Sequence, residues 1–552
     1  MAIHQPASIE EIQNFKGKYP KQLWYLFLIE MWERFTFYGM RALLGLYISH
    51  LILSVDYHAV SDEAKAKIVQ DYQTVQGETL DESHPQYYIE TSEQKYRDDA
   101  EAISNKRYGT IQAFIYAMAF VGGLFADKLF GFRKSIFWGG TLMAIGTFLM
   151  AIPGPFSFYL GISILIVGNG FFKPNISTMV GQLYKEGDPR RDAGFSLFYS
   201  GINIGALLAG LTIAYIGTSV SWAWGFASAG FCMLAGLALF VFTQKSLGPI
   251  GLVPDAEKFN KKVSGIKYGW IVQAATLLLI PVFFYLVYYP FDVQIGSKVL
   301  SFTDIIFIIA AIGTISYIVY QVRTATKEEG RRLTVAGILI LFSAIFWSFF
   351  EQGGGSLNFF ANGNVQSHGL NMTQVNNSVN ALWVVAIAPI IGIFWLWLNK
   401  RKKEPNMIVK FGYGFIFLGL GFLIFFASKI FATPDGLTPL AMFVFAYLII
   451  TIGELCLSPI GLSMVTKLSP QRLHGVMMGT WFLASAYGQY GAGIIGAALA
   501  KGSSETTENA SNFEKLITYT SGYQSIGIIA IVSGILLILI SPKLKKMMGG
   551  VR

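Results

Sequence analysis

The sequence has little charge and almost no cysteine. Only 14% of its 552 residues are Asp, Glu, Lys or Arg, whereas soluble chains contain about 25%. A soluble enzyme of this length would need charged side chains over most of its surface. The two cysteines, Cys232 and Cys456, exclude a disulfide scaffold. The net charge of +9 is not gathered on one segment, so nucleic-acid binding is also a poor interpretation.

Long apolar runs fill the chain instead, and 53% of its residues are apolar. A helix needs about 20 such residues to cross a bilayer. Because the first 20 residues are polar, we expect no removable signal peptide. The pattern predicts an all-α integral membrane protein with fourteen transmembrane helices. The expected spans lie at roughly 22–54, 108–127, 134–152, 156–183, 193–217, 221–243, 268–290, 302–322, 333–350, 379–399, 407–428, 437–466, 475–500 and 519–541.

Basic residues mark alternate loops between these spans. These loops and the two terminal segments hold 28 of the 42 Lys and Arg residues. Cytoplasmic loops carry such an excess, so we expect a multi-pass protein of the cytoplasmic (inner) membrane with both termini in the cytoplasm. The segment at about 55–107 has twelve acidic and six basic residues. We expect it to be a long outer loop, solvated and without direct chemistry. Part of it, at 62–72, has helix-forming composition.

Two passages repeat within the chain. Residues 173–180 resemble 458–465, and 189–194 resemble 470–475. Both pairs occupy equivalent places in the span order once the seventh and eighth spans are set aside. The chain is then expected to form two six-helix bundles with an inserted two-helix hairpin, and two six-helix halves are typical of the major facilitator fold. The expected units are a tail at 1–21, an N-terminal bundle at 22–243, a linker with the hairpin at 244–330, a C-terminal bundle at 331–541 and a tail at 542–552.

The loop after the second span resembles the signature between the second and third spans of facilitators. It reads Gly-Gly-Leu-Phe-Ala-Asp-Lys-Leu-Phe-Gly-Phe-Arg-Lys over 122–134. Glycines allow helices to approach closely, and an acid at a helix end pairs with a base or a helix N-terminus. We therefore expect a cytoplasmic latch between the halves that involves Gly123, Asp127, Arg133 and Lys134. The alternative is a basic turn that only obeys the orientation rule.

Few ionisable residues fall inside the expected spans, and each costs about 2.5–3.5 kcal/mol on insertion scales. Four are acids and three are bases, so one negative charge is in excess if all ionise. A buried carboxylate without a full partner takes up a proton. This arithmetic favours a proton-binding transporter. The seven residues are Glu30, Glu33, Arg34, Arg41, Lys173, Glu351 and Glu454.

The first span carries most of these charges on one helical face. Glu30, Glu33, Arg34, Tyr38 and Arg41 have the spacing of a stripe about 16 Å long. Such a stripe lays a polar path along half the membrane. The alternative is a charge ladder that only holds helices together.

The first span also carries a family resemblance. Residues 30–39 read Glu-Met-Trp-Glu-Arg-Phe-Thr-Phe-Tyr-Gly, which resembles the E-x-x-E-R-F-x-Y-Y-G signature of the proton-dependent oligopeptide transporter family. Residues 198–205 resemble its F-Y-x-x-x-N-x-G element. The resemblance covers nearly the whole chain, since it also includes Lys173-Pro174, Phe350-Glu351-Gln352, Gly453-Glu454, Ser458-Pro459 and Trp481-Phe482-Leu483.

The resemblance implies a proton-coupled symporter that imports di- and tripeptides by alternating access. Protons would be the coupling ion, with no other cofactor, no metal and no catalytic residue. We expect a functional monomer in the lipid bilayer and no nucleic-acid partner. Glu30, Glu33 and Arg34 would couple to the proton, and Glu351 would titrate while it pairs with Arg41. The peptide carboxylate would bind Arg41, Lys173, Tyr38 and Tyr116, its ammonium would bind Glu454, Asn203 and Asn380, and its side chains would contact Trp481 and Ser485.

The sequence departs from the family pattern at a few positions. Phe37 stands where the family usually has Tyr, and the Pro common after the residue equivalent to Asn380 is missing. The second span has no His, so coupling through carboxylates is favoured. Three rivals stay open: a facilitator for another small anion or zwitterion, a peptide sensor that does not transport, and a membrane enzyme. The six scattered His and two isolated Cys supply no ligand set for such an enzyme.

Overall fold

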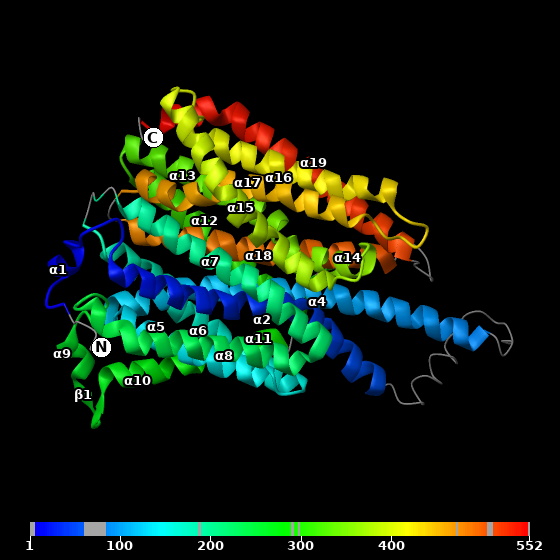
Figure 1. Ribbon diagram of the computed structural model, residues 1–552, viewed down its shortest axis with the longest axis horizontal. Helices are drawn as coiled ribbons and strands as arrows, with labels where there is room; N and C mark the ends of the chain where they lie inside the picture. Colours follow the sequence, from blue (N-terminus) through cyan, green and yellow to red (C-terminus); the bar gives the residue numbers. More distant parts are fainter. Residues whose placement is uncertain are drawn as a thin grey trace.

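The computed structural model describes residues 6–59, 84–185, 188, 190–288, 292–295, 298–470, 473–504 and 512–549. Long, roughly parallel helices dominate it, and both ends of the described chain lie at the same end of the molecule (Figure 1). Helices suit an apolar chain in a membrane because they satisfy every backbone polar group internally. Each of the fourteen predicted spans coincides with a helix or with consecutive helical segments.

The N-terminal half contains α2 (Lys21–Ala59), α4 (His84–Phe125), α5 (Phe132–Met150), α6 (Pro155–Gln182), α7 (Arg190–Tyr215) and α8 (Trp222–Thr243). The C-terminal half contains α13 (Lys327–Phe350), α15 (Met372–Lys400), α16 (Met407–Ser428), α17 (Leu440–Leu468), α18 (His474–Ser504) and α19 (Asn512–Met547). Between them lie α10 (Tyr268–Ala275), α11 (Leu279–Tyr288) and α12 (Phe302–Thr324).

Shorter elements connect these helices. Two antiparallel strand pairs, β1 (Lys262–Val263) with β2 (Ile266–Lys267) and β3 (Asp292–Ile295) with β4 (Lys298–Ser301), flank the first arm of the inserted hairpin. The remaining short α-helices of the described chain are α1 (Ile9–Gln13), α9 (Ala256–Asn260) and α14 (Ser356–Asn364).

The packing divides into two cores that follow the two halves. One buried apolar cluster draws mainly on residues from Ile12 to Phe307, and the other runs from Leu333 to Met548. Two six-helix bundles form the major facilitator architecture, here with an inserted hairpin between them, as the internal repeat predicted. Eleven helical stretches of the described chain are long and apolar enough to cross a membrane. The count of fourteen stays a prediction, because α2, α5 and α18 do not meet that criterion.

Close helix approach within the N-terminal half depends on glycine. A Cβ atom on Gly146 of α5 would lie 2.6 Å from the carbonyl oxygen of Gly161 on α6. A Cβ atom on Gly139 would lie 2.5 Å from the carbonyl oxygen of Gly168. Small residues allow this contact between helix backbones, which supplies packing energy where lipid offers no hydrophobic drive.

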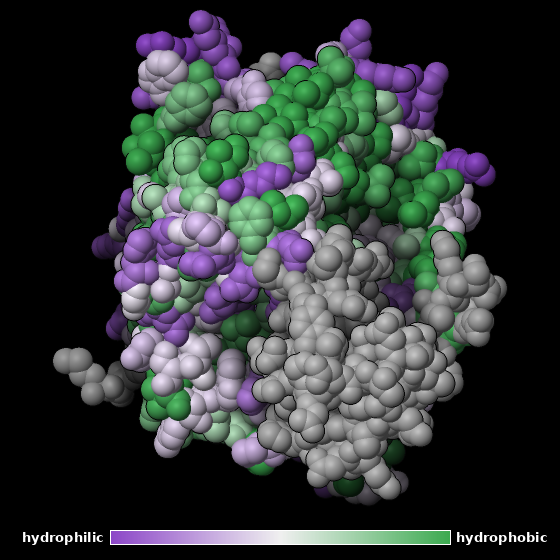
Figure 2. Space-filling view, turned by 90° about the vertical axis from the view of Figure 1, so that its right-hand side faces the viewer, coloured by the Kyte–Doolittle hydropathy of each residue, from purple (hydrophilic) through white to green (hydrophobic). Residues whose placement is uncertain are grey.

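Large apolar side chains stay exposed around the bundle, among them Ile309, Ile393 and Leu539. Such a surface suits contact with lipid. Figure 2 shows the end away from the termini, where hydrophobic residues lie in the upper part below a hydrophilic top edge, and hydrophilic residues gather to the left of the centre.

The predicted outer loop at about 55–107 is helical at both of its ends. The helix α2 continues to Ala59, and α4 begins at His84. Polarity indicates exposure to water rather than loss of helix, and much of the segment before Tyr108 consists of good helix formers. The stretch at 62–72, which has helix-forming composition, lies outside the described residues.

The inserted hairpin contacts both halves. The side chain of Trp138 on α5 donates a hydrogen bond of 3.2 Å to Thr276, which lies between α10 and α11. On α12, Asp304 lies 3.1 Å from the ammonium of Lys106 on α4 and accepts a hydrogen bond from Tyr490 of α18. The ring of Phe307 stacks on Tyr490 at 4.2 Å. Asp304 therefore ties the second arm of the hairpin to both bundles.

We predict that Asp304→Ala loosens α12. Breaking a buried, hydrogen-bonded carboxylate site costs about 1–3 kcal/mol, so the melting temperature of the purified protein is expected to fall by a few degrees, and amide exchange in α12 to increase. Ser301→Ala is the matched control, because Ser301 only caps α12 and bonds Asp304. If the two variants have equal stability and equal exchange in α12, Asp304 does not anchor the hairpin.

Candidate functional site

One ion pair joins the two halves in the interior. The guanidinium of Arg41 on α2 pairs with the carboxylate of Glu351, which opens the short turn Glu351–Gly354 after α13. The Nε atom of Arg41 also donates a hydrogen bond of 2.7 Å to the hydroxyl of Tyr108 on α4. Glu351 is 4% exposed and Arg41 is 14% exposed. The pairing expected from the sequence is therefore present.

Amide hydrogen bonds also join the two halves. Asn358 of α14 donates to the carbonyl of Ala42 at 3.3 Å. Asn371 donates to the hydroxyls of Thr218 and Ser219 at 2.7 and 2.9 Å. The Asn371 contacts lie beyond the C-terminal end of α7, whereas the start of α7 contacts the N-terminal segment through Arg190. The two halves thus meet at the end away from the termini (Figure 1).

Glu30, Glu33 and Arg34 form a buried cluster on α2. The Nε atom of Arg34 lies 2.7 Å from a carboxylate oxygen of Glu30 and 2.7 Å from one of Glu33. All three side chains are 3% exposed or less. Asn169 of α6 donates a hydrogen bond of 3.1 Å to the other oxygen of Glu33. One guanidinium therefore serves two carboxylates.

Lys173 lies one helical turn after Asn169 but makes no ion pair with any residue that the structure describes. Its Nζ atom lies 3.7 Å from the centroid of the Tyr116 ring and 5.8 Å from that of Phe37. A ring face attracts an ammonium without neutralising it. The charge of Lys173 is therefore available to an anionic group.

Glu454 is the corresponding acid of the other half. It is 7% exposed and accepts a hydrogen bond of 3.1 Å from the amide of Asn380. Asn380 also bonds the Thr451 hydroxyl at 3.0 Å, so its position beside Glu454 is fixed despite the missing proline. Within the described chain, Glu454 has no basic partner at ion-pair distance. A cation on one half and an anion on the other suit the two ends of a zwitterion.

The other predicted contact residues make contacts mainly within their own helices or are described by their burial alone. The Tyr38 ring centroid lies 5.7 Å from the Arg41 guanidinium carbon. Asn203 is half-buried, and its amide donates to the Tyr199 carbonyl of its own helix. Trp481 and Ser485 follow each other by one turn on α18, the first buried and the second half-buried.

The residues of the predicted latch have local partners. Arg133 donates to the carbonyls of Gly248 and Ile250, and Lys134 lies 3.6 Å from the Phe259 ring centroid. These basic residues therefore hold the linker after α8. Gly123 faces Pro174, with 3.8 Å from an added Cβ to the proline side chain. Asp127 is exposed and has no ion pair within the described ranges. A latch between the halves stays a prediction.

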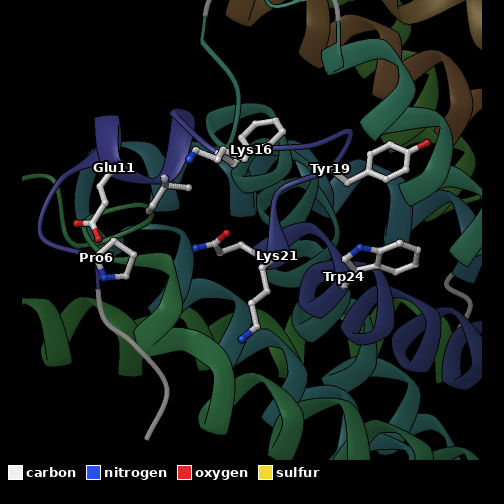
Figure 3. Close-up of a pocket in the computed structure, with 9 residues that line it drawn as sticks. Pro6, Glu11, Lys16, Tyr19, Lys21 and Trp24 are labelled. Atoms are coloured by element: carbon white, nitrogen blue, oxygen red, sulfur yellow. The ribbon is translucent and has the colours of Figure 1, made fainter.

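A separate cavity lies where the N-terminal segment folds back on α2. Its volume is about 460 Å³. Figure 3 shows Pro6 and Glu11 on one side and Tyr19 and Trp24 on the other. The segment is held there by Gln13, whose amide donates to the carbonyls of Gln182 and Tyr184. The cavity contains none of the predicted site residues.

The same end carries a local ion pair outside the membrane spans. Asp188 accepts hydrogen bonds from the side chain and backbone of Arg190, and these bonds lower the pKa of its carboxyl. Arg190 also donates to the carbonyls of Phe15 and Gly17. This ion pair thus helps to orient the Arg190 side chain, which donates hydrogen bonds to the N-terminal segment.

Sequence reasoning missed several residues of the site. Tyr108 binds Arg41, Asn169 binds Glu33, and Asn358 and Asn371 join the halves. Asn169 had a signal, since it precedes Lys173 by four residues and shares its helical face. The others had none, because their partners lie on distant segments.

The chain is similar to known proteins over most of its length. The POT family model matches residues 133–513. The uncharacterized transporter YclF of Bacillus subtilis (strain 168) is 33% identical over 97% of this chain and 96% of its own length. The di-/tripeptide transporter of Lactococcus lactis subsp. cremoris is 30% identical over 98% of both chains.

Solved structures have the same architecture. The crystal structure of a peptide transporter POT in complex with sulfate has a TM-score of 0.72 and 29% identity, and covers 99% of this chain and all of that one. A POT family transporter in complex with 5-aminolevulinic acid has a TM-score of 0.72 and 27% identity, and covers 97% of this chain and 99% of that one. This multi-pass membrane protein therefore belongs to the POT family and is a transporter, not an enzyme.

Proposed function

We propose that this protein is a proton-coupled symporter that imports di- and tripeptides across the cytoplasmic membrane by alternating access. The observation that carries the proposal is the placement of two charges without ion-pair partners in the described chain, Lys173 on one half and Glu454 on the other. A zwitterion neutralises both at once. The relative from Lactococcus lactis is named a di-/tripeptide transporter, and 5-aminolevulinic acid, bound by another relative, also carries an amine and a carboxylate.

Recognition of the two peptide ends accounts for broad acceptance of side chains. Lys173 and Arg41 would hold the carboxylate, and Glu454 would hold the ammonium. Neither contact depends on the side chains of the peptide, so one site accepts many sequences. The supporting residues are Tyr38 and Tyr116 for the carboxylate, Asn203 and Asn380 for the ammonium, and Trp481 and Ser485 for the side chains.

The proton acts on the contact between the halves. While Glu351 is ionised, it holds Arg41 and keeps the outer side shut. Protonation of Glu351 removes the charge attraction and frees Arg41 for the peptide carboxylate. The cluster of Glu30, Glu33 and Arg34 near Lys173 then resets the inner side. In this scheme the protein works as a monomer in the inner membrane with both termini in the cytoplasm, and the latch at Gly123, Asp127, Arg133 and Lys134 acts on the cytoplasmic side.

Uptake into proteoliposomes tests the proposal. With an inward proton gradient, labelled dialanine is expected to accumulate above its outside concentration, and unlabelled dipeptides are expected to compete. An uncoupler is expected to abolish accumulation. Binding without flux would indicate a sensor. Flux that does not depend on the proton gradient, or that unlabelled dipeptides do not reduce, would exclude a proton-coupled peptide transporter.

The two end contacts make a sharper prediction. Glu454→Gln is expected to weaken dialanine binding by at least about tenfold, because removing one member of a buried charge pair costs about 2–5 kcal/mol. N-acetyl-dialanine lacks the ammonium, so the same substitution is expected to change its weak binding little. Lys173→Gln is likewise expected to weaken dialanine binding. It is expected to change the weak binding of dialanine amide little, because dialanine amide lacks the carboxylate. The measurement is competition against labelled dialanine.

Equal losses for blocked and free peptides would contradict these assignments. In that case Lys173 and Glu454 would act on the fold or on conformation rather than on the peptide ends.

A further inference from the structure

Gln112 of α4 is a buried amide that neither the ion pairs nor the proposed peptide contacts involve. Its side chain is fully buried. Both its Nε2 and its Oε1 atom lack a hydrogen-bond partner among the residues that the structure describes. A buried polar group without a partner is costly, and the large majority of buried side-chain polar atoms in proteins have one. An amide that is unpaired at both atoms therefore indicates a partner that binds from outside the chain.

The position of Gln112 on α4 links it to the proposed peptide site. Tyr108, one turn before it, accepts a hydrogen bond of 2.7 Å from Arg41. Tyr116, one turn after it, has its ring centroid 3.7 Å from the ammonium of Lys173. Residues four apart share one face of a helix. Gln112 thus lies on that face between the neighbours of the two cations that would hold the peptide carboxylate.

A carboxamide suits the peptide group next to that carboxylate. Arg41 and Lys173 carry only donors, so neither accepts a hydrogen bond from the peptide N–H. The oxygen of a glutamine amide accepts hydrogen bonds, and its NH2 group donates them. In an extended residue the N–H and the carbonyl oxygen point to the same side. One glutamine can therefore pair with the N–H of the last peptide residue and with an oxygen of its carboxylate.

The helix α18 offers a structural alternative for the same side chain. A Cβ atom on Gly109, three residues before Gln112, would lie 2.7 Å from the carbonyl oxygen of Gln489 on α18. Gln489 is 2% exposed, and its Oε1 atom has no hydrogen-bond partner within the described ranges. A bond between the two amides would join the halves and leave the peptide aside. These two described side chains form no such bond, since both polar atoms of Gln112 are unpaired.

We infer that Gln112 is a substrate-binding residue that accepts a hydrogen bond from the peptide N–H beside the terminal carboxylate and donates one to that carboxylate. The inference rests on the proposed function and deepens it, because it names a residue that recognises the peptide bond itself. A zwitterion of equal length without this N–H lacks the first contact. Gln112 therefore favours peptides over other amino acids with distant amine and carboxylate groups, whatever side chains the peptide carries.

Two ligands isolate this contact. Glycylglycine and 5-aminolevulinic acid have an amine, a carbonyl and a carboxylate at the same spacing, but 5-aminolevulinic acid has a CH2 group in place of the peptide N–H. The inhibition constant of each is measured by competition against labelled dialanine on the purified protein. Gln112→Met keeps the length of the side chain but removes donor and acceptor. We expect this variant to lose about three- to tenfold more affinity for glycylglycine than for 5-aminolevulinic acid.

Two further variants separate recognition from packing. Gln112→Glu keeps an acceptor at the same place, so its relative affinity for glycylglycine is expected not to fall. Gln489→Met is the matched control, because it removes the same groups from a similarly buried glutamine at the contact between α4 and α18. We expect Gln489→Met to leave the ratio of the two inhibition constants unchanged.

An unchanged ratio of the two inhibition constants in Gln112→Met would overturn the inference, whether or not both ligands bind more weakly. An equal change of this ratio in Gln489→Met would overturn it as well, since the contact between the helices would then account for the effect. If Gln112→Met does not fold, a fall in the relative affinity of Gln112→Glu for glycylglycine overturns it. If neither ligand competes with dialanine on the unsubstituted protein, the proposed function fails instead.

Discussion

The ion pair between Arg41 and Glu351 is the contact on which the rest of the arrangement depends. It crosses between the halves in a buried environment, where charges attract strongly only while both are ionised. Removing one partner leaves an uncompensated charge. A protonated Glu351 therefore weakens the contact between the halves far more than the loss of a surface salt bridge would. A buried pair of this kind is a poor source of stability but a sensitive switch.

The other buried charges follow from the same constraint. Ionisable groups in a membrane interior must pair, protonate or meet a ligand. Arg34 satisfies two acids incompletely, Lys173 rests on the Tyr116 ring, and Glu454 has only the Asn380 amide and no base within the described chain. Each incompletely paired group is compensated by a species that the transporter would carry, either a proton or one end of a peptide. Binding and coupling thus use the same shortage of partners.

Much of this arrangement could be predicted from the sequence. Apolar runs gave the helices, because a chain with so few charges cannot cover a soluble surface. The spacing of Glu30, Glu33, Arg34 and Arg41 placed them on one face, and the first-span motif led to the pairing of Arg41 with Glu351. The extent of helix in the segment at about 55–107 could not be predicted, because polarity indicates exposure to water and not whether the backbone is helical. Partners such as Tyr108 and Asp304 could not be found either, since they meet their neighbours only through tertiary packing of segments far apart in the chain.

The most direct test of the account is whether titration of Glu351 opens the outer side. Nitroxide labels at Val220→Cys and Leu370→Cys, both exposed beside the Ser219–Asn371 contact, would report the separation of the halves by electron paramagnetic resonance after Cys232 and Cys456 are replaced. We expect one short distance at alkaline pH, a longer population at acidic pH, and the longer population at both pH values in Glu351→Gln. If the distance between the labels stays short at both pH values and in Glu351→Gln, this ion pair is not the outer gate.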